Sequence, residues 1–303
     1  MSTLPIVVGV DGSDGSLRAL DWALAEAQLR GAPLRLVHVR QYAAWTRPEA
    51  LATSPQQPAD DLVLARVLSS LTGRTHLPEL DSSSLEGAPG AVLTEAGQSA
   101  QLLVLGSRGR GGFASLLLGS SGMAAARDAP CPVVVVPRPG REVPDTGPTE
   151  PGPRIVVGVS AETPDTDALS FACAEAARHV ARLHVVCAYP WPAYAWAGPG
   201  DFVPTPEDQE AAQAATADQL DEILGPYRAS YPDVTIQPKV LPGDAAGHLV
   251  AASKDAVLVV VGRHRRRLLH PTRLLGSVTH AVLLHAAAPI AVVPPSQPLE
   301  PAA

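Results

Sequence analysis

The chain has 303 residues, of which 46% are hydrophobic, 17% charged and 4% aromatic, and its net charge is −7. This length suits two ordinary domains better than one, and the composition is that of a globular protein with cores of Val, Leu and Ala. The acidic charge argues against the broad basic surface that nucleic-acid binding requires. With neither a basic, apolar leader nor a long apolar run, we expect a cytoplasmic protein without membrane contact.

The three cysteines are an odd number and show neither CxxC spacing nor a nearby set of histidines. These features argue against a metal site and against a disulfide framework. We therefore expect buried thiols at Cys131, Cys173 and Cys187.

The chain contains an internal repeat, which sets its domain organisation. The segment IVVGV at residues 6–10 recurs at 155–159, and PVVVVP at 132–137 resembles PIAVVP at 289–294. The stretch between the repeats is rich in Pro and Gly, which is typical of a linker. We predict one domain over 1–138, a linker over 139–153 and a second domain over 154–303.

Within each half, short β-branched runs alternate with longer Ala- and Leu-rich stretches of helical period, a pattern that predicts βα units and a parallel sheet. Two further stretches, 41–60 and 189–206, are rich in Pro and aromatic residues and predict surface excursions, either lids or plain insertions. The strands expected in chain order are 6–10, 34–39, a weaker candidate at 80–85, 102–105, 133–136, 155–159, 183–186, 234–240, 257–261 and 290–293.

The fourth expected strand runs into the glycine-rich sequence GSRGRGGFASLLLGSSG at residues 106–122. Glycines there allow positive φ and remove Cβ atoms, so that backbone N–H groups close around phosphate oxygens, and the helix that follows adds a second anion site at its N-terminus. The alternative is a loop that joins strand to helix without a ligand. There is no Walker lysine. The candidate phosphate-binding residues are Gly106, Ser107, Arg108, Gly109, Arg110, Gly111, Gly112, Gly119, Ser120 and Ser121.

The spacing Gly106-x2-Gly109-x9-Gly119-Ser120 resembles the G-x2-G-x9-G-[ST] motif of the ATP-binding universal stress proteins. The segments IVVGVDGS, EGAPGAVL and APCPVVVVP are similar to the same family, and the resemblance covers nearly all of both halves.

This resemblance implies two tandem Rossmann-like domains of the adenine nucleotide alpha hydrolase-like kind. Each would be a five-stranded parallel sheet of order 3-2-1-4-5 with helices on both faces, and ATP would lie over the carboxyl ends of strands 1 and 4. Gly9 and Asp11 would lie beside the nucleotide, Asp11 near the ribose or Mg²⁺-bound phosphates, and Val39 would contact the adenine. An Asp after a strand is otherwise a turn or helix N-cap residue.

The second half departs from the motif. Ser160 stands where the first half has Asp11, Arg265 occupies the position of the second glycine, and Gly276 comes one residue late. A non-glycine residue there must avoid positive φ or accept strain. We expect a weaker second site that consists of Gly158, Gly262, Gly276, Ser277 and Val278.

A dense basic cluster lies in the altered loop of the second half. Three interpretations stay open: a solvated loop, a modified phosphate site, or a contact surface for an acidic partner; the net charge and the absence of interleaved aromatic residues argue against nucleic acid. The cluster consists of Arg263, His264, Arg265, Arg266, Arg267 and His270.

The functional hypothesis is an ATP-binding regulatory or stress-response module that needs no catalytic residues. A slow ATP hydrolase and a nucleotide-independent interaction module are the alternatives; the expected loops contain no His or Glu suited to act as a general base. We also predict that the two halves pair through their last strands, since an open apolar edge there would promote aggregation. A homodimer of the whole chain and a protein partner are further expectations.

Overall fold

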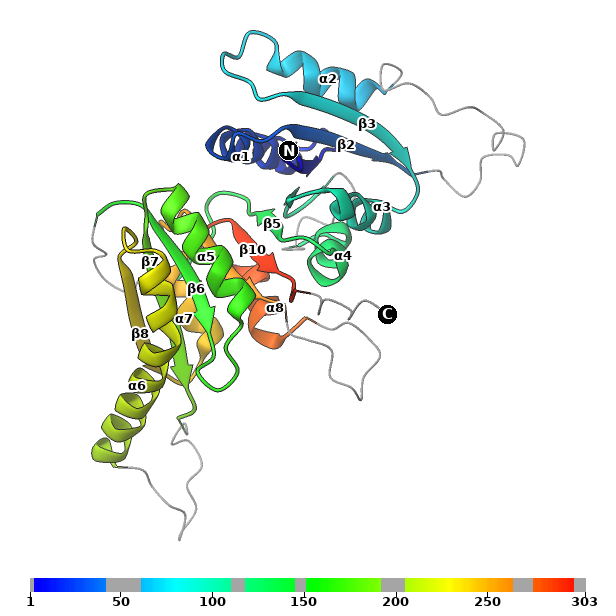
Figure 1. Cartoon of the computed structure of the whole chain (residues 1–303). Coiled ribbons are helices and arrows are strands. Elements are labelled where there is room, and N and C mark those ends of the chain that lie inside the picture. The colour runs from blue at the N-terminus through cyan, green and yellow to red at the C-terminus, as the bar shows by residue number, and fades with distance from the viewer. Residues whose placement is uncertain are drawn as a thin grey trace, which may run out of the picture. The chain divides into compact units, whose positions relative to one another are not determined.

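The computed structural model describes residues 3–41, 61–109, 118–144, 151–191, 205–263 and 275–296 (Figure 1). By its contacts the chain divides into two compact units. The first unit consists of Met1–Arg141, Arg263–Leu275 and Pro289–Pro294; the second consists of Glu142–Gly262, Gly276–Ala288 and Pro295–Ala303.

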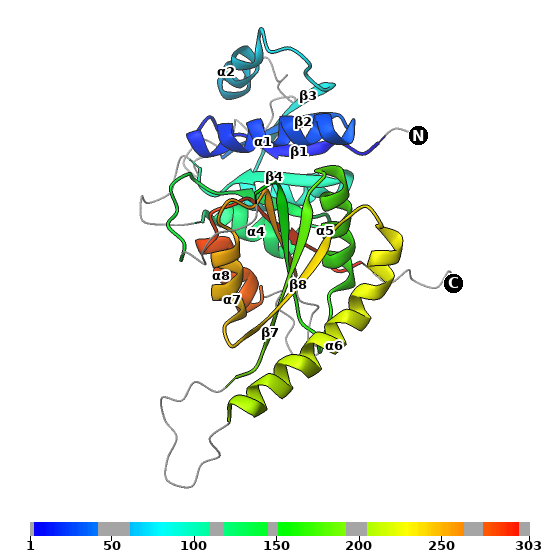
Figure 2. The same cartoon turned by 90° about the vertical axis from the view of Figure 1, so that its left-hand side faces the viewer.

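The first unit is a sheet with helices on its two faces. Its strands follow the order β3-β2-β1-β4-β5, with parallel pairing throughout this set. Helices α1 and α2 lie on one face of this sheet and α4 on the other (Figure 2), and α3 packs against α4; this is the arrangement that right-handed crossovers produce. The elements are β1 Ile6–Gly9, α1 Asp14–Arg30, β2 Leu34–Arg40, α2 Leu62–Leu71, β3 Leu80–Glu86, α3 Pro89–Ala96, β4 Leu102–Gly106, α4 Ser120–Asp128 and β5 Val133–Val136.

Helix α1 shows why the sequence folds as it does beside the site. Ser13 caps its N-terminus, and Gly31 ends it in the left-handed conformation with φ of 57°. Between these caps, Ala19, Ala23 and Ala27 are fully buried, so small side chains bring the helix axis close to the sheet. The position of the helix N-terminus at the carboxyl edge of the sheet follows from this packing.

The last strand of the chain belongs to the first unit. β10, Ile290–Val293, pairs antiparallel with β5, with Ile290 opposite Val135 and Val292 opposite Val133 (Figure 1). The predicted pairing of the two last strands is confirmed. The division by contacts therefore differs from the division by repeats, because the apolar edge of β5 is covered by a strand from the other half of the sequence.

The second unit repeats the α/β pattern. Its strands follow the order β8-β7-β6-β9 and are parallel, which agrees with four of the five positions expected for that half. The elements are β6 Arg154–Val159, α5 Thr166–Arg178, β7 Arg182–Tyr189, α6 Pro206–Ser230, β8 Ile236–Pro242, α7 Ala245–Ala252, β9 Leu258–Gly262 and α8 Ser277–His285.

The predicted α/β class with parallel strands is confirmed, and the weak candidate at 80–85 is the strand β3. Of the two predicted excursions, 42–60 and 192–204 lie outside the described residues. The predicted bounds of the second excursion, 189–206, were wrong, because Tyr189 is the last residue of β7 and Pro206 is the first residue of α6. A proline at the first turn of a helix loses no hydrogen bond, so its presence does not exclude a helix start. All three cysteines are free and buried, as predicted.

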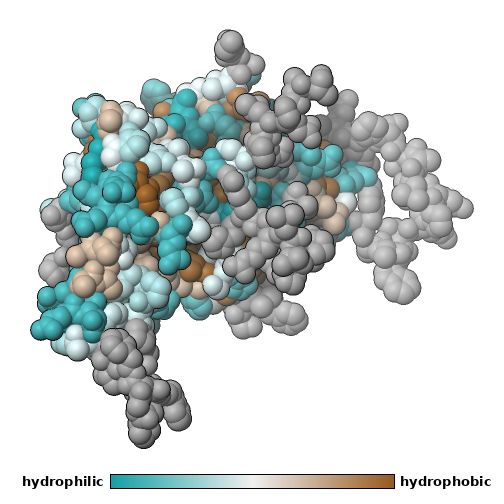
Figure 3. Space-filling view, turned by 60° about the horizontal axis from the view of Figure 1, so that its bottom comes forward, coloured by the Kyte–Doolittle hydropathy of each residue, from teal (hydrophilic) through white to brown (hydrophobic). Residues whose placement is uncertain are grey.

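The coloured part of the face drawn in Figure 3 is mostly hydrophilic. On the face drawn in Figure 3, hydrophobic residues form only small separate patches among the coloured atoms. Among the described residues, no helix is both long and apolar enough to cross a membrane.

Candidate functional site

The candidate site lies at the carboxyl edge of the first unit. β1 ends at Gly9 and β4 at Gly106, and the two strands pair in parallel, with Val8 opposite Val104. The residues that follow both strands therefore leave the sheet at the same edge. This brings Asp11 next to the glycine-rich loop, although 95 or more residues separate them along the chain.

The loop after β1 is a compact turn that holds one oxygen of Asp11. Asp11 Oδ1 accepts hydrogen bonds from the backbone N–H of Ser13 at 3.0 Å and from its hydroxyl at 2.6 Å. Ser13 in turn caps α1, since its Oγ accepts from the N–H of Ser16. Oδ1 of Asp11 therefore acts as the turn residue that the sequence allowed. Oδ2 faces the glycine-rich loop after β4.

Gly109 lies directly against this carboxylate. A Cβ atom on Gly109 would be 2.4 Å from Asp11 Oδ2, which is closer than real Cβ contacts come. Two residues that the motif assigned to one site are therefore brought together. Any side chain at position 109 would displace the carboxylate or the loop.

The start of the glycine-rich loop packs backbone to backbone on the first turn of α1. A Cβ on Gly106 would lie 2.5 Å from the carbonyl carbon and oxygen of Gly15, and a Cβ on Gly15 would lie 2.4 Å from the carbonyl oxygen of Arg108. Backbone atoms cannot move aside as a flexible side chain does. Both glycines are thus required for the loop to sit on the helix.

The expected reason for the motif glycines was wrong in one respect. Gly106, Gly109 and Gly119 do not have φ in the left-handed range. Gly106 and Gly109 are required because they approach Gly15 and Asp11 closely, whereas a Cβ on Gly119 would come no nearer than 3.7 Å to the carbonyl oxygen of Ser107. Because Gly109 itself does not have a positive φ, the expected backbone strain at Arg265, the matching position of the second half, does not follow.

The second candidate anion site is the N-terminus of α4. Gly119 donates its N–H to the carbonyl of Ser107 at 2.8 Å, and buried Ser107 donates to Val136 on the neighbouring strand. The helix begins at Ser120, and no side chain among the described residues caps it. Its first N–H groups, including that of Ser121, therefore have no partner within the helix.

Other predicted residues lie at the margin of this site. Val39 is half-buried near the end of β2, opposite Leu85. Gly9 packs against Leu93 and Leu105, where a Cβ would clash. Arg110, Gly111 and Gly112 lie outside the described residues.

In the second half, a different carboxylate takes the place beside the loop. Ser160 forms a turn with Thr163, and the longer connection ends at Asp165, which caps α5 by accepting from the N–H of Ala168 at 3.0 Å. A Cβ on Gly262 would be 1.9 Å from Asp165 Oδ2. Position 160 has no carboxylate, as the sequence indicated, but Asp165 supplies one from five residues further on. The helix-capping sequence TPD is the signal that could have identified it.

The remaining residues of the weaker site occupy their expected elements. Gly158 faces Leu249 of α7, and α8 begins at Ser277 after Gly276, with no capping side chain among the described residues. Val278 follows in its first turn. Of the basic cluster only Arg263 is described: its Nη1 donates to the carbonyl of Ala129 at 2.7 Å. His264, Arg265, Arg266, Arg267 and His270 lie outside the described residues.

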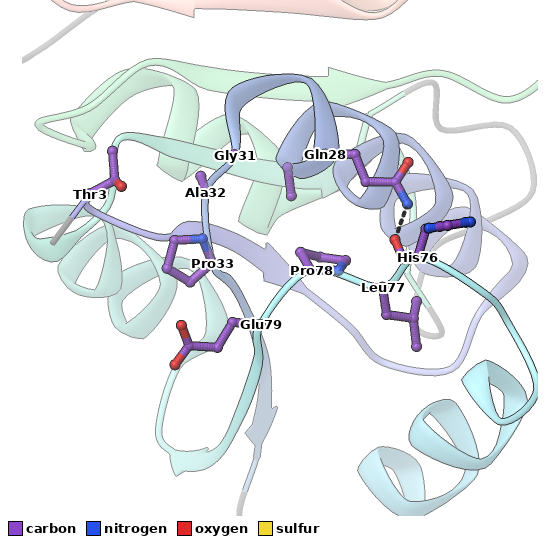
Figure 4. A pocket seen from close by; sticks show the side chains of 10 residues that line it. Thr3, Gln28, Gly31, Ala32, Pro33, His76, Leu77, Pro78 and Glu79 are labelled. Carbon is purple, nitrogen blue, oxygen red and sulfur yellow. Dashed lines mark hydrogen bonds between the residues drawn. The ribbon is translucent and has the colours of Figure 1, made fainter.

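A cavity of about 560 Å³ lies at the opposite edge of the first unit. Pro33 and Pro78, which line it, precede β2 and β3, and Gln28 Nε2 donates to the carbonyl of His76 at 2.5 Å (Figure 4). It lies at the amino ends of the strands, so it takes no part in the candidate site.

Comparison with known proteins gives the family. Residues 3–137 and 153–294 match the universal stress protein family. Universal stress protein Rv2005c of Mycobacterium tuberculosis is 32% identical over 295 residues, covering 95% of this chain and 96% of that relative. A solved universal stress protein of Archaeoglobus fulgidus covers 98% of this chain and 100% of its own, with a TM-score of 0.65 at 16% identity.

A further solved universal stress protein, described as in complex with cAMP, is 28% identical and covers 45% of this chain and 98% of its own, with a TM-score of 0.34. The family assignment rests on the match of both halves of the chain to the family model. The chain therefore belongs to the universal stress protein family and carries two of its domains in tandem.

Proposed function

We propose that the first half binds ATP at the carboxyl ends of β1 and β4 and acts as a regulatory nucleotide-binding module of the stress response. The observation that carries this proposal is the contact between Gly109 and Asp11. A connection that only joined a strand to a helix would not need a glycine whose Cβ, if present, would lie 2.4 Å from a carboxylate oxygen. With no side chain at position 109, a phosphate group would have access to the backbone N–H groups of this loop.

The parts of the nucleotide are assigned by chemistry. Phosphates suit the N–H groups of the loop and the uncapped N-terminus of α4. The ribose hydroxyls suit Asp11, and the adenine suits the apolar side chain of Val39. Mg²⁺ would be held mainly by the phosphates, since Asp11 Oδ1 already accepts two hydrogen bonds and a single carboxylate is a small part of a six-ligand shell. The metal would neutralise phosphate charge.

We favour a regulatory role over catalysis. The described residues that follow β1 and β4, Val10–Ser13 and Ser107–Gly109, include no His or Glu that would activate water. Weak hydrolysis is the competing hypothesis. Phosphate release followed over hours, with and without protein, separates the two.

The binding proposal is tested by titration of a fluorescent ATP analogue, with ADP, AMP and cAMP as competitors. Mass spectrometry identifies any nucleotide that co-purifies. Gly109→Ala should weaken ATP binding about tenfold or more, because its Cβ displaces Asp11. Gly225→Ala is the matched control: a Cβ there meets nothing within 4 Å, so binding should not change. Equal affinity in the wild type and Gly109→Ala would contradict the assignment, and absence of nucleotide binding by the wild type would favour the interaction module.

A further inference from the structure

Arginines follow both β4 and β5 at the same distance from the last paired residues. Gly106 lies opposite Val136, and two residues later come Arg108 and Arg138. The N–H of Ser107 donates to the carbonyl of Val136 at 2.9 Å, which keeps the two chains together one step beyond the ladder. Both arginines therefore leave the sheet at the edge where the glycine-rich loop begins.

A third arginine, Arg141, lies near the first two because the chain turns after β5. The chain bends at Pro139, and Gly140 adopts the left-handed conformation with φ of 75°. This turn allows Arg141, three residues after Arg138, to lie near it. Arg141 is half-buried, whereas Arg138 is exposed and makes no hydrogen bond or ion pair with the described part of the chain.

The three guanidinium groups influence one another. Burial, together with the positive charges of Arg138 and Arg108, lowers the pKa of Arg141 to about 10. Like charges held together in a protein that is acidic as a whole raise its energy. An anionic ligand relieves that repulsion.

We infer that Arg138 and Arg141, together with Arg108, bind the distal phosphates of a nucleoside polyphosphate and thereby select ATP over AMP. This inference rests on the proposed function. The segments that carry the arginines start beside both phosphate-binding elements of that site, because Ser107 is hydrogen-bonded to Gly119 before α4 and to Val136 at the end of β5. Guanidinium groups bind phosphate oxygens through two parallel hydrogen bonds, so each arginine adds affinity only where a phosphate is present.

The second half has no arginine at the two positions that match Arg138 and Arg141. After β10 the sequence continues PPSQP, so Pro295 and Pro298 stand at the positions that correspond to Arg138 and Arg141. Proline offers no hydrogen-bond donor. The contribution that we assign to Arg138 and Arg141 is therefore confined to the first half.

The experiment measures affinity for ATP, ADP and AMP by competition with a fluorescent ATP analogue, using the full chain. Arg138→Ala with Arg141→Ala should weaken ATP binding about 100-fold, roughly tenfold for each arginine, and leave AMP binding within about twofold. The exposed arginine of α2, Arg66→Ala, is the matched control for loss of positive charge. If the double alanine variant does not fold, as judged by circular dichroism, Arg138→Gln with Arg141→Gln takes its place.

The outcomes are distinguishable. Loss of ATP affinity with AMP affinity retained supports the inference. Equal loss for both nucleotides, or no loss for ATP, overturns the inference and leaves the proposed nucleotide site intact. A wild-type protein that binds none of the nucleotides overturns the proposed function, and with it this inference.

Discussion

The two halves have the same strand and helix plan but differ at the carboxyl edge of the sheet. In the first half, Gly109 lies against Asp11, and the carboxylate belongs to a short turn after β1. In the second half, a longer connection brings the helix cap Asp165 against Gly262 instead. The comparison teaches that the fold alone does not define a phosphate site: loop length decides which carboxylate reaches the loop and where.

The largest expected effect is on ATP affinity, and it distinguishes the loop after β4 from the loop after β9. Gly109→Val should weaken ATP binding about 100-fold or more, because its side chain occupies the space of Asp11 Oδ2. Gly262→Val should leave most ATP binding intact, although it displaces Asp165 and lowers stability. Calorimetry on the wild type and both variants measures this, and retention of binding in Gly109→Val or two equivalent sites in the wild type would contradict the assignment of function to the first half.

The second comparison concerns the helix that follows the second strand of each half. Asp61 caps α2 from a buried position: His38 Nδ1 and the Ser84 hydroxyl each lie 2.6 Å from its Oδ2, and Oδ1 accepts from Leu64 N–H. Burial would raise the pKa of Asp61, but the hydrogen bonds outweigh it and lower the pKa to about 2 from 3.8. The ionised carboxylate therefore stabilises the folded state above pH 4.

Asp61→Asn should accordingly reduce the free energy of unfolding by about 2 kcal/mol at pH 7. Because the folded-state pKa lies below the unfolded one, this difference should vanish as the pH falls from 4 to 2. Thr205→Ala in the exposed capping box of α6 should cost about 1 kcal/mol. Its pH dependence should be weaker than that of Asp61→Asn, because it arises only from the exposed Asp208, whose pKa the Thr205 hydrogen bonds lower. Urea unfolding at several pH values measures both; a pH-independent effect of Asp61→Asn would show that its charge contributes nothing.

The third comparison concerns Asp11 and Ser160, which occupy matching positions after the first strand of each half. Asp11→Asn keeps an oxygen that accepts from Ser13 but removes the charge, so it should weaken binding of Mg-ATP about tenfold. Ser160→Ala should have no effect on that binding. Titration with the fluorescent ATP analogue measures both variants. If Asp11→Asn binds Mg-ATP as tightly as the wild type, Asp11 stabilises only the turn and does not contribute to nucleotide binding.

The smallest effect lies at the ends of α1 and α5. Gly31 and Val180 occupy corresponding positions, and both have left-handed backbones, with φ of 57° and 48°. A β-branched residue is strained there, and the side chain of Val180 is 87% exposed, so it gains little from burial. Val180→Gly should raise the free energy of unfolding by about 1 kcal/mol, measured by urea unfolding. Destabilisation by this change would mean that the valine makes a contact that outweighs its strain.

Several features followed from the sequence because they rest on local or repetitive signals. The repeat of IVVGV predicted two similar α/β halves, and the apolar runs 133–136 and 290–293 predicted strands whose edges needed cover. The spacing from Gly106 to Gly119 identified the loop. Such patterns survive folding because strand alternation, helix period and glycine content are properties of short segments.

Other features required the tertiary structure, because they depend on which atoms meet across the fold. Glycine at 109 is needed because Asp11 arrives from another strand, and no local pattern reports that distance. Asp165 reaches Gly262 only because α5 begins there. Arg138 and Arg141 became candidates only when the register of β4 and β5 placed them beside Arg108. The sequence by itself determined the architecture and the loop, whereas close approach between distant segments decided which residues complete the site.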